Sequence, residues 1–152
     1  MPPRPEVALA LLRVVVGGVF AAHGADKIFG TGLEAVTANF RTWEVPLPLL
    51  TAPLVAVLEL AGGVLLALGL GARAIAVMLA AEMLAALWFV HREGGFFAPR
   101  GVELPLLLFA GCVAVAVGGP GRPAFGRSGN GTAPSPTSKP RATESRGGRQ
   151  KG

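Results

Sequence analysis

Four long apolar stretches dominate the sequence and limit what the chain can fold into. They are Val7–Ala25, Ala52–Gly71, Ala74–His91 and Val102–Gly118. Each is close to the roughly 20 residues that an α-helix needs to cross about 30 Å of hydrocarbon. Lipid offers no hydrogen bonds to an open backbone, so apolar stretches of this length are expected to be helical. The sequence therefore predicts an all-α membrane protein, with four transmembrane helices forming a bundle within residues 1–121.

The connection between the first two stretches, Asp26–Leu50, carries a helical pattern of its own. Its apolar side chains recur at helical spacing at Leu33, Val36, Phe40 and Trp43. We expect a short amphipathic helix on the outer membrane surface, ended by Pro46 and Pro48. Pro53 then falls in the first turn of the second span, where its missing N–H does no harm.

Charge is distributed unevenly along the chain. Residues 1–121 hold seven Lys/Arg and eight Asp/Glu, whereas residues 122–152 hold seven Lys/Arg and one Glu. The high pI therefore comes from the tail, and a folded basic face for nucleic acid is not expected. The tail has almost no apolar residues and is predicted to be a disordered, basic extension. Attraction of this tail to anionic lipid is a second interpretation.

The basic residues also orient the bundle. Arg4, Arg73 and the tail fall on one side, and the opposite side has the fewer cations Lys27, Arg41, Arg92 and Arg100. By the positive-inside rule, both termini are predicted to be cytoplasmic.

The sequence lacks the motifs that several kinds of catalytic or metal-binding site require. Cys112 is the single cysteine and lies in an apolar run, so paired-thiol chemistry is excluded. The sequence has no metal-spaced Cys/His cluster, no phosphate loop and no Ser/His/Asp signature. We therefore expect no metal, and no cofactor-binding motif is evident.

Ionisable residues inside the spans are the most informative, because they are costly in hydrocarbon and normally face the bundle interior. On the first helix, Arg13, His23 and Lys27 share one broad face with several glycines. On the second, Glu59 shares a face with Gly62 and Gly63, as helical spacing requires. We predict that these two faces meet, with the small residues making room.

Depth along the helices predicts the pairings. His23 and Glu59 fall at a similar level, and Lys27 lies within reach of Glu103 at the start of the fourth helix. Arg13 lies deeper and is expected to pair with Glu82 or Glu59, which makes Glu82 a secondary candidate. Such pairs could simply fix helix register. Alternatively, His23, Glu59 and Glu103 could form a pocket for a quinone-like ligand or for protons.

Two further interpretations of these residues remain open. His23 and His91 end helices that run in the same direction, and two imidazoles at one depth could ligate haem or a metal. An intramembrane glutamate would also suit a small proton-coupled transporter.

Three segments together resemble the DoxX family. The first is Leu12-Arg13…Gly17…Phe20…His23-Gly24…Lys27-Ile28-Phe29-Gly30. The others are Glu59-Leu60-Ala61-Gly62-Gly63 with Arg73 after it, and Gly95-Phe96-Phe97…Gly101-Val102-Glu103. The resemblance covers about residues 7–121. It implies a multi-pass protein of the bacterial inner membrane, with Arg13, His23, Lys27, Glu59 and Glu103 at the family's positions. The family's name derives from a component associated with thiosulfate–quinone oxidoreduction.

Two functions of different classes follow. The first is an accessory subunit of a membrane oxidoreductase complex, more an auxiliary chain than a stand-alone enzyme, with a quinone as its ligand. The second is a non-catalytic adaptor or assembly factor whose buried ion pairs hold the bundle together. The expected partners are the lipid bilayer and proteins of a membrane complex. The small residues on the helix faces also permit a homo-oligomer.

Overall fold

The computed structural model describes residues 4–91, 94–97 and 101–125, and these residues form helices joined by turns. The elements in chain order are α1 (Arg4–Ala25), η1 (Asp26–Gly30), α2 (Leu33–Thr42), α3 (Pro48–Val57), η2 (Leu58–Gly62), α4 (Gly63–Leu68), α5 (Ala72–Phe89) and α6 (Glu103–Gly118). The elements η1 and η2 are single π-helical turns. Since η1 continues α1, and η2 joins α3 to α4, the described chain contains five continuous helices.

The lengths of these helices agree with a membrane protein. Arg4–Gly30, Pro48–Leu68 and Ala72–Phe89 are each long and apolar enough to span a bilayer. The helix α6 is also apolar but has 16 residues, about 24 Å at 1.5 Å per residue. The predicted all-α membrane fold is confirmed. Four complete crossings remain a prediction, because α6 is shorter than the other three apolar helices.

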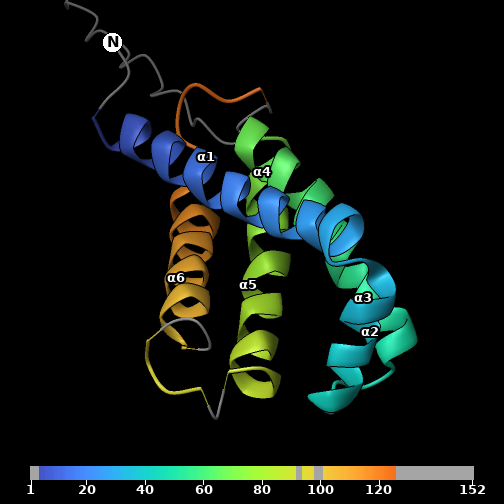
Figure 1. The fold of residues 1–152 in the computed structure, drawn as a ribbon. Helices are drawn as coiled ribbons and strands as arrows, with labels where there is room; N and C mark the ends of the chain where they lie inside the picture. The colour runs from blue at the N-terminus through green and yellow to red at the C-terminus, as the bar shows by residue number, and fades with distance from the viewer. Residues whose placement is uncertain (1–3, 92–93, 98–100, 126–152) are drawn as a thin grey trace, which may run out of the picture.

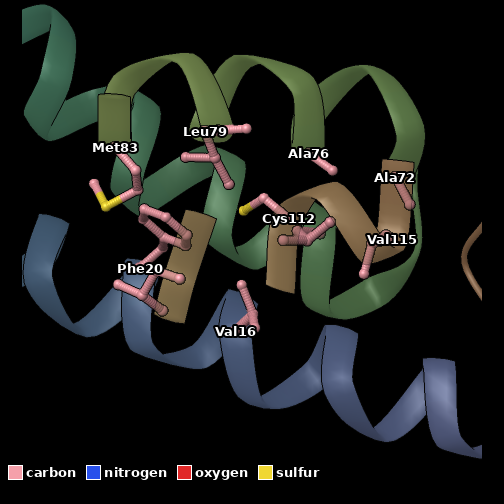
Figure 2. Packing of buried hydrophobic residues seen from close by; sticks show 11 residues of the cluster. Val16, Phe20, Ala72, Ala76, Leu79, Met83, Cys112 and Val115 are labelled. Atoms are coloured by element: carbon pink, nitrogen blue, oxygen red, sulfur yellow. The ribbon is translucent and has the colours of Figure 1, made fainter. Parts of the chain in front are cut away.

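The arrangement of the helices is oblique rather than parallel. Figure 1 shows α5 and α6 side by side, while α1 runs diagonally to them. The helices α2 and α3 lie near the C-terminal end of α1. Figure 2 shows the main core, where Phe20 of α1 meets Leu79 of α5 and Cys112 of α6. All three side chains are fully buried.

The short helix α2 forms as predicted in the first connection. Its buried side chains Val36 and Phe40 pack against Ala52 of α3, which makes a second, smaller core. The polar side of α2 faces away from this contact, since Glu34 and Arg41 are exposed. An amphipathic helix is therefore confirmed, although part of its apolar side is covered by α3.

The second long helix starts earlier than predicted. It begins at Pro48 rather than Ala52, so Pro53 lies inside the helix and not in its first turn. Pro48 occupies the first helical position, for which the fixed φ of proline is suited. The hydroxyl of Thr51 donates to the carbonyl oxygens of Pro46 (3.1 Å) and Leu47 (3.1 Å), which provides partners for carbonyls at this start.

The segment after α6 is ordered further than predicted. The backbone N–H of Arg122 donates to the carbonyl of Glu6 (3.0 Å), and that of Phe125 donates to the carbonyl of Leu68 (3.1 Å). Residues 119–125 therefore run across α1 to the end of α4, so the first four residues of the predicted tail, 122–125, lie against the helices. The rest of the predicted tail, 126–152, lies outside the described residues, as do Arg92 and Arg100 of the predicted outer face.

Candidate functional site

The candidate site lies where α1 packs closely against the continuous helix formed by α3, η2 and α4. A Cβ atom added at Gly17 would lie 2.5 Å from the carbonyl oxygen of Gly63, and one at Gly24 would lie 2.3 Å from the nitrogen of Leu60. A Cβ at Gly63 would in turn lie 2.5 Å from the nitrogen of Ala21. No larger side chain fits between these backbones, so the prediction that the two faces meet through small residues is confirmed.

An ion pair crosses this interface. The ammonium group of Lys27 donates a hydrogen bond to the Oε2 atom of Glu59. The Glu59 side chain is 6% exposed and that of Lys27 is 21% exposed, so protein covers most of the pair. A charge in the membrane interior is expensive unless it has such a partner.

Both members of the pair lie in π-helical turns. Lys27 lies in η1 and Glu59 lies in η2. A π-turn adds one residue to a helix and rotates the side chains that follow it, and such turns occur often at functional sites. No feature of the sequence identified these turns, although both charged residues lie in them.

A second carboxyl group joins the pair from α5. Glu82 lies near enough to Glu59 and Lys27 to interact electrostatically with both. Its Oε2 atom is buried and has no hydrogen-bond partner among the described residues. We call Lys27, Glu59 and Glu82 the polar triad. It unites two residues predicted as primary candidates with the one predicted as secondary.

The structure places His23 differently from its predicted position. His23 is exposed on the flank of α1, while its neighbour Gly24 is buried in the interface. The predicted contact between His23 and Glu59 is therefore wrong, and Lys27 occupies that place. On an ideal helix of 100° per residue, Lys27 lies about 50° and His23 about 90° from the centre of the buried face. Lys27 therefore lies nearer than His23 to the face of α1 that is buried in the structure.

Arg13 is also separated from the acidic residues. It is 3% exposed, and its Nη2 atom donates to the carbonyl oxygen of Pro123 (2.6 Å). Its guanidinium lies against Gly69 at the end of α4, where a Cβ would come 1.9 Å from Nη1. Fourteen residues of helix separate Arg13 from Lys27, about 21 Å. The predicted pairing with Glu82 or Glu59 is therefore wrong.

This position suits a cation for a different reason. The C-terminal end of a helix carries partial negative charge, which a guanidinium stabilises. Within the described chain, Nε and Nη1 of Arg13 have no hydrogen-bond partner. Arg13 thus holds residues 119–125 against the end of α4, away from the polar triad.

The last candidate, Glu103, is the first residue of α6 and is half-buried. This is the predicted position, at the helix N-terminus where a carboxylate is favoured. His91, just beyond the end of α5, is half-buried as well. The described residues contain no group of three or more His, Cys, Asp or Glu that could hold a metal ion.

Comparison with known proteins identifies relatives of this chain. The DoxX family model matches residues 8–92, which include the whole polar triad. A protein of Bacillus subtilis (strain 168), described as "Putative oxidoreductase CatD", is 33% identical over 103 residues, covering 68% of this chain and 74% of that protein. An uncharacterized protein of Haemophilus influenzae (strain ATCC 51907 / DSM 11121 / KW20 / Rd) is 36% identical over 103 residues, covering 65% and 73% of the two chains. No solved structure matches the chain significantly.

Proposed function

The chain belongs to the DoxX family of membrane proteins, and on that premise we propose that it is a membrane subunit of a redox complex that binds a quinone head group. The observation that carries the proposal is the protein-covered ion pair of Lys27 and Glu59. The relative described as an oxidoreductase supports the redox class.

The chemistry of the pair suits a quinone. A quinone head group presents carbonyl oxygens that accept hydrogen bonds and take up protons when the ring is reduced. The ammonium of Lys27 can donate a charge-assisted hydrogen bond to such an oxygen. The carboxyl of Glu59 can exchange a proton with it, which is the usual task of a general acid–base group. Electrons would come from a partner protein of the complex.

A titration with a short-chain quinone tests this proposal. The protein would be reconstituted in lipid nanodiscs, and the quinone bound would be measured for the wild type and for Glu59→Gln. We expect saturable binding in the wild type and at least a tenfold weaker affinity in the variant. Glu34→Gln, on the exposed side of α2, is the matched control and should bind normally. Equal binding by wild type and Glu59→Gln would contradict the proposed site.

A second function, a non-catalytic adaptor, is favoured by one observation. The ion pair joins η1 to η2 at the tight glycine interface, where it could serve only to fix the register of the two helices. The charge-swapped double variant Lys27→Glu with Glu59→Lys separates the two functions. For an adaptor, the swap restores both stability and partner binding. For a quinone site, it restores stability but leaves quinone binding impaired, because the donor and the acid have exchanged positions.

We also propose that the protein lies in a bacterial inner membrane with both termini in the cytoplasm. The support is the charge distribution, which places Arg4, Arg73 and the basic residues after Gly121 on one side.

A further inference from the structure

The segment that follows α6 lies against the end of the bundle where α1 begins. A Cβ atom added at Gly121 would lie 2.3 Å from the carbonyl oxygen of Glu6 and 2.4 Å from the nitrogen of Ala10, so the segment passes directly over the backbone of α1. It ends beside α4, where the N–H of Phe125 donates to the carbonyl of Leu68 (3.1 Å). Figure 1 shows this segment, in orange, reaching the end of α4. We call residues 119–125 the strap.

A buried arginine holds the strap in place. Arg13 is 3% exposed, and its Nη2 atom donates to the carbonyl oxygen of Pro123 in the strap. Its Nε and Nη1 atoms have no partner among the described residues, and a cation is costly to bury in this way. An anion bound at this end of the bundle would offset part of that cost, because charges interact strongly across a medium of low dielectric constant.

The strap also brings exposed arginines together. A Cβ atom added at Gly119 would lie 3.3 Å from Nη2 of Arg73, at the start of α5. The backbone of Arg122 is hydrogen-bonded to Glu6, two residues after Arg4. All three arginines are exposed. Of the described helix ends that meet here, only that of α1 contributes an acid, Glu6, so positive charge exceeds negative charge on this surface.

Apolar side chains lie beside these arginines. Phe125 is 83% exposed at the end of the strap, and Val117, two residues before the strap, is 77% exposed. Aromatic residues are common at the boundary between lipid headgroups and hydrocarbon. Acyl chains could therefore lie against these side chains while a phosphate lies on the arginines.

We propose that the strap, with Arg73, Arg122 and Phe125, binds the phosphate headgroup of an anionic phospholipid. Arginine donates paired hydrogen bonds to phosphate oxygens, and basic sites between the ends of membrane helices suit anionic headgroups. The inference goes beyond the proposed function and does not depend on quinone binding.

Native mass spectrometry of delipidated protein in a neutral detergent tests the site. We expect the wild type to bind phosphatidylglycerol at least fivefold more tightly than phosphatidylcholine, and the double variant Arg73→Gln with Arg122→Gln to lose this preference. The double variant Arg141→Gln with Arg146→Gln removes the same charge from the sequence after the strap and should keep it. Inorganic phosphate at the lipid concentration should not displace phosphatidylglycerol, because phosphate has no acyl chains.

A further variant moves the strap but leaves every charge in place. In Gly121→Ala the added methyl group would overlap the backbone of α1, and φ at this residue is +65°. We expect phosphatidylglycerol to bind at least fivefold more weakly to this variant. Gly18→Ala is the matched control and should bind normally, since nothing lies within 4 Å of the added group.

Four results would overturn the lipid site. Equal binding of the two lipids by the wild type would show that it has no preference for an anionic headgroup. Equal losses in the two double arginine variants, or unchanged binding in Gly121→Ala, would show attraction by net charge alone. Displacement by inorganic phosphate would show a site for small anions rather than for lipid.

Discussion

Lys27 and Glu59 form a link between two long helices that depends on both residues being present. Removing one partner leaves the other charge covered by protein and unpaired, which is more damaging than removing both. The nearby carboxyl of Glu82 increases this asymmetry, because without Lys27 two acids remain without a cation. At the scale of single residues, the pair should therefore show strong energetic coupling.

A double-mutant cycle measures this coupling. We expect Lys27→Met and Glu59→Gln each to lower the free energy of unfolding by about 3 kcal/mol, the lower end for a broken buried pair, since Lys27 is 21% exposed. The combined variant should cost clearly less than the sum of the two single variants. Unfolding in mixed detergent micelles provides the measurement, and Glu34→Gln provides the surface control. Additive effects would show that the two side chains do not interact in the folded protein.

The contact between α1 and α4 depends on where glycine occurs along the helix. Gly17 faces the backbone of α4, whereas a Cβ atom added at its neighbour Gly18 would have no atom within 4 Å. A methyl group at Gly17 must push two helix backbones apart, and this change would also shift η1 relative to η2. At the scale of elements, the packing of small residues therefore sets the geometry of the polar triad.

Two alanine substitutions one residue apart test this dependence. Gly17→Ala should lower the free energy of unfolding by about 1–3 kcal/mol, as expected for overpacking. Gly18→Ala should be neutral or slightly stabilising, since alanine is the better helix former by up to about 1 kcal/mol. The same unfolding assay compares the two variants. Equal effects at both positions would contradict the close approach of α1 and α4.

The helices and their facing sides could be predicted from the sequence more accurately than the contacts between side chains. The lengths of the apolar stretches identified the helices. The helical spacing of the small and charged residues placed Gly17 and Gly63 at the interface. The partner of Glu59 was misassigned, since it depends on the π-turns and on the oblique course of α1. Neither the π-turns nor the crossing angle of α1 produces a repeating pattern in the sequence. A π-turn adds a single residue, and the crossing angle is set by how the helices pack.

The partner of Arg13 could not be predicted for another reason. Its acceptor is the backbone carbonyl of Pro123, 110 residues further along the chain, and the sequence marks no carbonyl as an acceptor. Only acidic side chains stand out in a sequence as partners for a guanidinium, which is why Arg13 was assigned to Glu82 or Glu59. At the scale of the whole molecule, Arg13 instead closes the chain by joining residues 119–125 to α1 and α4.

The orientation of the whole molecule can be tested with single cysteines. With Cys112 replaced by serine, Thr42→Cys at the end of α2 and Ser128→Cys in the basic C-terminal region would be labelled with a membrane-impermeant maleimide on intact spheroplasts. We expect Thr42→Cys to react from outside and Ser128→Cys to react only after permeabilisation. The reverse pattern would show that the termini lie outside and would contradict the proposed topology.

A quinone site at the Lys27–Glu59 pair should retain its ligand when the protein is extracted together with native lipid. Mass spectrometry would compare the quinone that accompanies the wild type and Glu59→Gln, at equal amounts of folded protein. We expect quinone to accompany the wild type in excess of bulk lipid and to fall to the bulk level in the variant. Quinone at the bulk level in both proteins would contradict the site and would favour the adaptor function.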